Sequence, residues 1–78
     1  MISRDEVVAE IEQELDYMFD AAAETISQST RRTIKIEALA YAKRVLDSLS
    51  TAELQSESAR QRFMITTLRD AERRVRGS

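Results

Sequence analysis

The sequence predicts an all-α protein, a small three-helix bundle assembled as a dimer, and three observations support this. The 78 residues contain no proline and one glycine, so the residues that make the turns of strand-rich folds are nearly absent. Apolar residues recur at intervals of three and four along three segments, which is the period of helices packed on one another. The length fits a single helical domain covering residues 1–78.

The small size of the core is the reason to expect a homodimer. Hydrophobic residues make up 42% of the chain, but ten of them are alanines, which bury little surface. A core in a chain this short rarely contributes more than about 3–5 kcal/mol, and such chains often gain stability from an oligomer or a partner.

The first predicted helix spans residues 4–27. Ser3 precedes it and Glu6 follows three residues later, which is the spacing of a capping box. In that motif the two side chains bond backbone N–H groups that the first turn leaves free. The apolar face of this helix consists of Val7, Val8, Ile11, Leu15, Met18, Phe19, Ala22 and Ile26.

The second predicted helix spans residues 30–49. The segment SQST before it contains capping residues and no apolar side chain, and the apolar face changes phase across it, so we expect a bend there. A single long helix through this segment, exchanged between two chains, is the alternative. The apolar face consists of Ile34, Ala38, Leu39, Ala42, Val45, Leu46 and Leu49.

The third predicted helix spans residues 51–75. Ser50 and Glu53 repeat the capping-box spacing at its start. Ala59 is the only apolar residue between positions 55 and 62, so the helix either continues from 51 or restarts at Ser56 or Ser58. Its apolar face consists of Phe63, Met64, Ile65, Leu68, Ala71 and Val75.

Charge is distributed unevenly along the chain. Residues 1–28 carry eight acids and one base, a net charge of −7, whereas residues 29–49 carry +3 and residues 50–78 carry +2. The acids of the first helix recur every four residues, so like charges are neighbours on its surface. One row is Glu6, Glu10 and Glu14, and the other is Glu12, Asp16, Asp20 and Glu24.

These acidic rows have three interpretations. They form a solvated face that arginines and lysines of the same chain neutralise, or they bind a basic surface on another protein, or they lie on a basic helix of a second copy. In a variant of the second interpretation, carboxylates about 6 Å apart imitate the phosphates of a nucleic acid. The candidate partner-binding residues, with Tyr17 as an aromatic anchor, are Glu10, Glu14, Asp16, Tyr17, Asp20 and Glu24.

The basic segments support an alternative hypothesis. Arg31, Arg32 and Lys35 lie near the start of the second helix, where cations oppose the helix dipole, so local stability does not explain them. They pair with the first helix or they contact phosphate. The alternative is therefore a nucleic-acid-binding or assembly protein, although an isoelectric point near 5.1 is unusual for that class. Its candidate residues are Arg31, Arg32, Lys35, Arg60 and Arg62.

The composition excludes most catalytic chemistry. The chain has no histidine and no cysteine, so the usual general base near neutral pH, the commonest metal ligand and the thiolate nucleophile are all absent. A chain whose one glycine is Gly77 has no glycine-rich phosphate loop. We expect no catalytic residues, no metal and no cofactor.

The absence of a long apolar run predicts a cytoplasmic protein without a membrane segment. The hypothesis that fits these features best is a non-catalytic, protein-binding regulator or inhibitor of the kind that phages and mobile elements encode.

Overall fold

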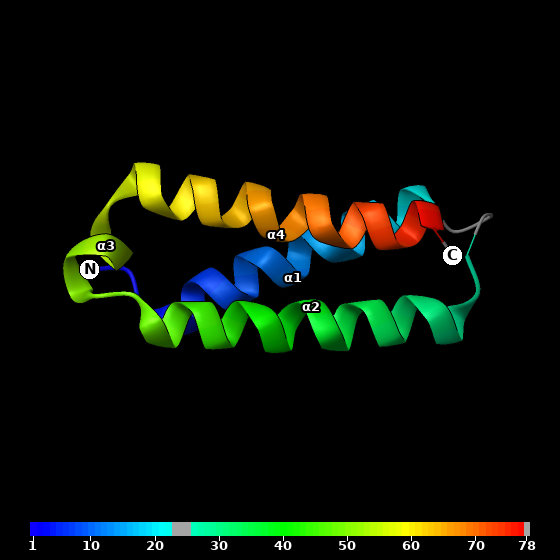
Figure 1. The fold of residues 1–78 in the computed structure, drawn as a ribbon, viewed down its shortest axis with the longest axis horizontal. Helices are drawn as coiled ribbons and strands as arrows, with labels where there is room; N and C mark the ends of the chain where they lie inside the picture. The colour runs from blue at the N-terminus through cyan, green and yellow to red at the C-terminus, as the bar shows by residue number, and fades with distance from the viewer. Residues whose placement is uncertain (23–25, 78) are drawn as a thin grey trace.

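The computed structural model describes residues 1–22 and 26–77, and these form four helices. They are α1 (Arg4–Ala21), α2 (Gln28–Ser48), α3 (Thr51–Gln55) and α4 (Glu57–Gly77). The three long helices form an elongated bundle of 40 × 18 × 18 Å, and the short α3 closes one end of it (Figure 1). α1 and α4 run in the same direction, and α2 runs opposite to both. The predicted all-α helical bundle is confirmed.

The first helix ends earlier than predicted. α1 ends at Ala21, and the backbone is not helical at Ile26 and Ser27, so the predicted end at residue 27 is wrong. Ser27 instead caps α2, because its hydroxyl accepts a hydrogen bond of 3.2 Å from the Thr30 N–H. The alternative of one continuous helix through this segment is therefore also wrong. Positions 23–25 of the predicted helix lie outside the described residues.

The predicted third helix is two helices. α3 ends at Gln55, and α4 restarts after Ser56, whose hydroxyl accepts a hydrogen bond of 3.3 Å from the Ala59 N–H. The restart at Ser56 is thus confirmed, and an unbroken helix over 51–75 is wrong. The capping box at the start of α3 is confirmed, since Ser50 and Glu53 exchange two hydrogen bonds of 3.1 Å. The bond from the Ser50 backbone N–H holds the pKa of Glu53 below its usual value.

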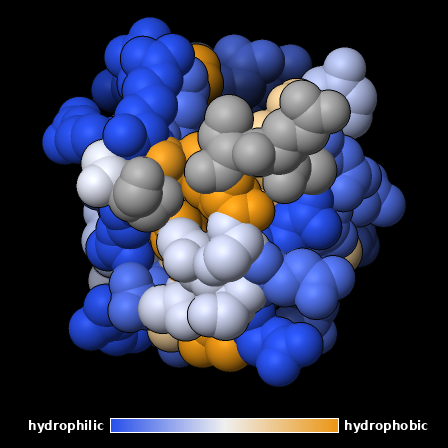
Figure 2. All heavy atoms as spheres, turned by 90° about the vertical axis from the view of Figure 1, so that its right-hand side faces the viewer, coloured by the Kyte–Doolittle hydropathy of each residue, from blue (hydrophilic) through white to orange (hydrophobic). Residues whose placement is uncertain are grey.

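The core follows the line along which the three long helices meet. α1 contributes most of the largest fully buried side chains, and α2 adds Leu46. Three of the buried residues of α2 and α4 are alanines. Seen from one end of the bundle, hydrophilic side chains surround a small apolar area (Figure 2). Among the described residues, the buried hydrophobic ones are Val7, Ile11, Leu15, Phe19, Ile34, Ala38, Ala42, Leu46, Leu54 and Ala71.

The face that α4 buries differs from the predicted one at two positions. Thr67 is 1% exposed, and its hydroxyl donates a hydrogen bond of 2.9 Å to the Phe63 carbonyl, so a polar residue occupies a core position at no cost in unpaired groups. Ile65, which was predicted to belong to the apolar face, is 49% exposed. α4 is therefore rotated so that an apolar side chain faces solvent.

Polar side chains tie the α3 end of the bundle to the start of the chain. The Arg4 guanidinium donates hydrogen bonds to the carbonyls of Leu46 (2.9 Å) and Leu49 (2.8 Å), at the C-terminal end of α2 where carbonyls lack partners within the helix. The Gln55 side chain accepts a hydrogen bond of 2.9 Å from the Ile2 N–H and donates one of 2.8 Å to the Ile2 carbonyl. The first residues of α1 are thereby held against α2 and α3.

Candidate functional site

Three acids of one row on α1 lie beside cations of α2. The Lys35 ammonium lies 2.9 Å from the Asp16 carboxylate and 3.9 Å from that of Glu12. The Arg31 guanidinium lies 3.0 Å from the Asp20 carboxylate. The hydrogen bond to Asp16 raises the pKa of Lys35 above its usual value. Asp16 and Asp20 thus pair with cations of the same chain, as the first interpretation expects, while Glu24 lies outside the described residues.

These ion pairs determine the charge that α1 presents more than they stabilise the fold. The side chains of Asp16 and Asp20 are 52% and 78% exposed, and exposed pairs contribute about 0.2–1 kcal/mol each. Arg31 also covers the ring of Phe19, with its guanidinium carbon 5.9 Å from the ring centre. Arg31 and Lys35 are therefore both engaged at the contact between α1 and α2.

The other acidic row forms no ion pair with the described residues. Glu10 and Glu14 are exposed, and among the described residues no cation lies within 4.0 Å of either carboxylate. Tyr17 follows Glu14 by three residues, so the two side chains are neighbours on the helix surface, and Tyr17 is 77% exposed. We refer to Glu10, Glu14 and Tyr17 as the acidic patch.

The predicted partner-binding residues thus fall into separate groups. The structure brings some of them together on an open helix face and places others in ion pairs with α2. The first group is Glu10, Glu14 and Tyr17, the second is Asp16 and Asp20, and Glu24 lies outside the described residues.

The basic candidates do not share one surface. Arg31 and Lys35 lie in the first half of α2, whereas Arg60 and Arg62 lie near the start of α4, at the opposite end of the bundle (Figure 1). The Arg60 guanidinium donates a hydrogen bond of 2.7 Å to the Leu54 carbonyl and so closes the end of α3. Arg32 and Arg62 are exposed and have no charged partner in the described parts of the chain.

Sequence reasoning missed a row of arginines along α4. Arg62, Arg69 and Arg76 are spaced seven residues apart, so they lie along one side of the helix. We refer to these three residues as the arginine row. Arg76 pairs with Glu72 at 2.6 Å, while Arg62 and Arg69 have no ion pair with any described residue. The seven-residue spacing was visible in the sequence.

Within residues 1–22 and 26–77, no group of three or more acidic, histidine or cysteine side chains is arranged to hold a metal ion. Over the same ranges, no helix combines the length and apolar character needed to cross a bilayer.

Comparisons of the chain with protein-family models, with curated proteins and with solved structures found no match.

Proposed function

We propose that this protein is a non-catalytic binding module whose acidic patch docks on a basic surface of another protein. The observation that supports it is the difference between the two acidic rows. Asp16 and Asp20 have cations of the same chain at 2.9 and 3.0 Å. Glu10 and Glu14 have none within 4.0 Å among the described residues.

The patch combines two properties that suit an interface. Two carboxylates four residues apart repel each other by about 0.2–0.5 kcal/mol, and cations of a partner would turn this small cost into attraction. The ring of Tyr17, 77% exposed, supplies an aromatic surface that binding would bury. The charge would steer the encounter, and the ring would anchor the complex.

Occupying a basic surface of a larger protein makes this chain a regulator or inhibitor of that protein. Where the surface normally binds nucleic acid, the carboxylates take the place of phosphates and the inhibition is competitive. The acidic patch is preferred to the basic residues of the alternative hypothesis because Arg31, Lys35 and Arg60 already make contacts within the chain.

The test is to remove the charge of the patch without reversing it. The double variant Glu10→Gln, Glu14→Gln keeps helix-forming side chains and raises the net charge by two. Each protein is immobilised and exposed to a lysate of the cells that make it. We expect the double variant to retain at most about one tenth of the amount of partner that the unmodified protein retains. Quantitative mass spectrometry of the retained proteins gives the measurement.

Asp47→Arg is the matched control, because it raises the net charge by the same two units at an exposed position in the last turn of α2. It should retain the partner as the unmodified protein does. Full retention by the double variant, or an equal loss in both variants, would contradict a role for the patch.

A further inference from the structure

We infer that the α1/α4 face of the bundle binds a second copy of this chain about a two-fold axis. We define this face as the side of α1 and α4 that points away from α2, carrying the acidic patch on α1 with Ile65 and Arg69 on α4. Arg62 lies at the edge of this face, because it also lines a groove with Tyr41 and Val45 of α2. The inference rests on the proposed function, because it names a second copy as one partner of the same patch. It gives the predicted dimer a specific interface.

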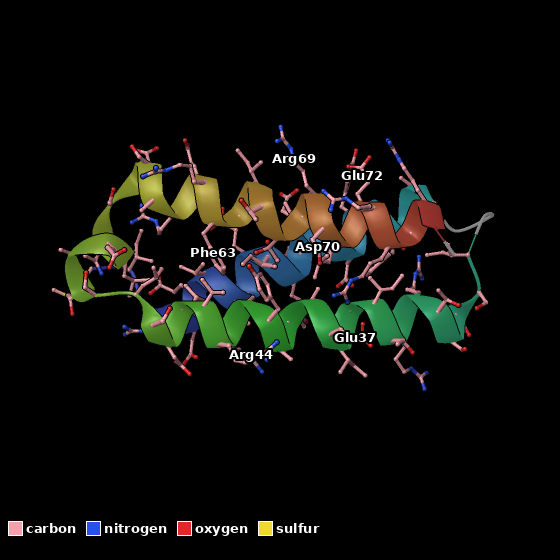
Figure 3. All side chains as sticks on the ribbon, in the orientation of Figure 1. Glu37, Arg44, Phe63, Arg69, Asp70 and Glu72 are labelled. Atoms are coloured by element: carbon pink, nitrogen blue, oxygen red, sulfur yellow. The ribbon has the colours of Figure 1, made fainter. Side chains whose placement is uncertain are left out.

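The contacts with α2 show which side of α4 faces away from it. Arg74 pairs with Glu37 of α2 at 2.6 Å, so its side of the helix faces α2. Arg69 lies five residues earlier, rotated by about 140° around the helix, and points away from α2 (Figure 3). Ile65 lies four residues before Arg69, hence on the same side, and is 49% exposed.

The contacts with α2 also show which side of α1 faces away from it. Asp16 reaches Lys35 of α2 at 2.9 Å, so its side of the helix faces α2. Glu14 lies two residues earlier and is rotated from Asp16 by about 160°. Glu10 and Tyr17 lie four and three residues from Glu14, so they share its side. The acidic patch therefore faces away from α2, as Arg69 and Ile65 do.

The face is complementary to itself. Its α1 half carries Tyr17 and two carboxylates, and its α4 half carries Ile65 and Arg69, with Arg62 at the edge beside α2. Neither these carboxylates nor these arginines form an ion pair with a described residue. A two-fold rotation places each acidic half on the arginine half of the other copy, so every contact occurs twice. Since both halves lie on one face, the contact closes into a dimer and does not extend into a chain.

The dimer would also cover apolar surface that the single chain leaves in water. Tyr17 and Ile65 are 77% and 49% exposed, and both lie on the face that the second copy would occupy. Covering them would add apolar burial to a bundle whose core contains several alanines. A second copy and any other basic partner would compete, because both bind the acidic patch.

A charge exchange tests this geometry. We expect the unmodified chain to sediment as a dimer. Two double variants reverse the charges: one is Glu10→Arg with Glu14→Arg, and the other is Arg62→Glu with Arg69→Glu. Each should raise the dissociation constant of the dimer at least about tenfold, because like charges then meet twice. An equimolar mixture of the two variants should restore a dimer containing one copy of each. Sedimentation equilibrium measures the masses.

Four outcomes would overturn the inference. They are a wild-type monomer up to about 1 mM, a dimer that persists in either variant, a mixture of two helical variants that stays monomeric, and a mixture that forms chains longer than two. Circular dichroism checks that the variants are helical. Where a reversed variant unfolds, Glu10→Gln, Glu14→Gln and Arg62→Gln, Arg69→Gln replace it, and each must weaken the dimer for the inference to stand.

The two proposals fail separately. Arg62→Glu, Arg69→Glu leaves the acidic patch intact, so its monomer should still retain a basic partner from lysate if the proposed function holds. A monomeric wild type whose partner is lost on Glu10→Gln, Glu14→Gln removes the dimer and leaves the proposed function. If the charge exchange restores the dimer but no retained protein is lost on Glu10→Gln, Glu14→Gln, the dimer stands and the proposed function fails.

Discussion

Replacing Phe19 with alanine is expected to unfold the protein at room temperature. Phe19 is 1% exposed and is among the largest fully buried side chains of the described residues. Truncating a buried phenylalanine to alanine costs about 3–5 kcal/mol, which is about as much as a core of this size contributes in total. Far-ultraviolet circular dichroism of the Phe19→Ala variant should show most of the helical signal lost, with no cooperative thermal transition.

Ile36→Ala is the control for this prediction. It also truncates a large hydrophobic side chain to alanine, but Ile36 is 61% exposed on α2, outside the acidic patch, so its loss should change the free energy of unfolding by less than about 0.5 kcal/mol. If Phe19→Ala melts cooperatively within a few degrees of Ile36→Ala, the packing of α1 against the other helices is not as described.

The second large effect is expected from Arg4→Met. The substitution keeps an apolar stem and removes the guanidinium that bonds the carbonyls of Leu46 and Leu49 at the end of α2. Partly buried carbonyls that lose their donor cost about 1–3 kcal/mol in total. Urea denaturation should show the free energy of unfolding lowered by this amount.

Arg44→Met, at an exposed position of α2 with no charged partner among the described residues, should change it by less than about 0.5 kcal/mol. Equal losses in the two variants would show that the Arg4 hydrogen bonds do not stabilise the end of α2.

The parts of the fold that follow from local chemistry were predictable. Ser3 and Ser50 were recognised as caps from spacing alone, because a cap needs only a short side chain and the N–H groups of the next turn. The helical type of the long segments was equally predictable from the three-to-four spacing of their apolar residues.

The parts of the fold that depend on which of several neighbouring residues begins or ends a helix were not predictable from the sequence. The start of α2 was predicted at residue 30, where Ser29 would be the cap, but Ser27 caps the helix and α2 begins at Gln28. The early end of α1 at Ala21 was not predicted, because the apolar spacing continues beyond that residue. The burial of Thr67 was not predicted because a search for apolar residues passes over threonine, although its hydroxyl can bond a carbonyl of its own helix.

The ion pairs between α1 and α2 could have been predicted from the sequence, but the apolar pattern alone does not predict them. In an antiparallel pair of helices, residues equally far from the connection are neighbours. Asp20 with Arg31 and Asp16 with Lys35 are each centred on the same point of the chain, and both pairs form. Which acids remain unpaired depends on how α1 is rotated about its axis, and that is a property of the packed core.

The central claim is that the acidic patch is open in the single chain and covered in the assembled protein. Carbodiimide labelling of carboxylates, read by mass spectrometry, tests it on the dilute purified chain and on the same chain assembled in lysate. We expect Glu10 and Glu14 to react faster than the hydrogen-bonded Asp16 in the dilute chain, and to become protected on assembly, while Glu57 at the start of α4 reacts equally in both. Unchanged labelling of Glu10 and Glu14 on assembly would contradict the claim.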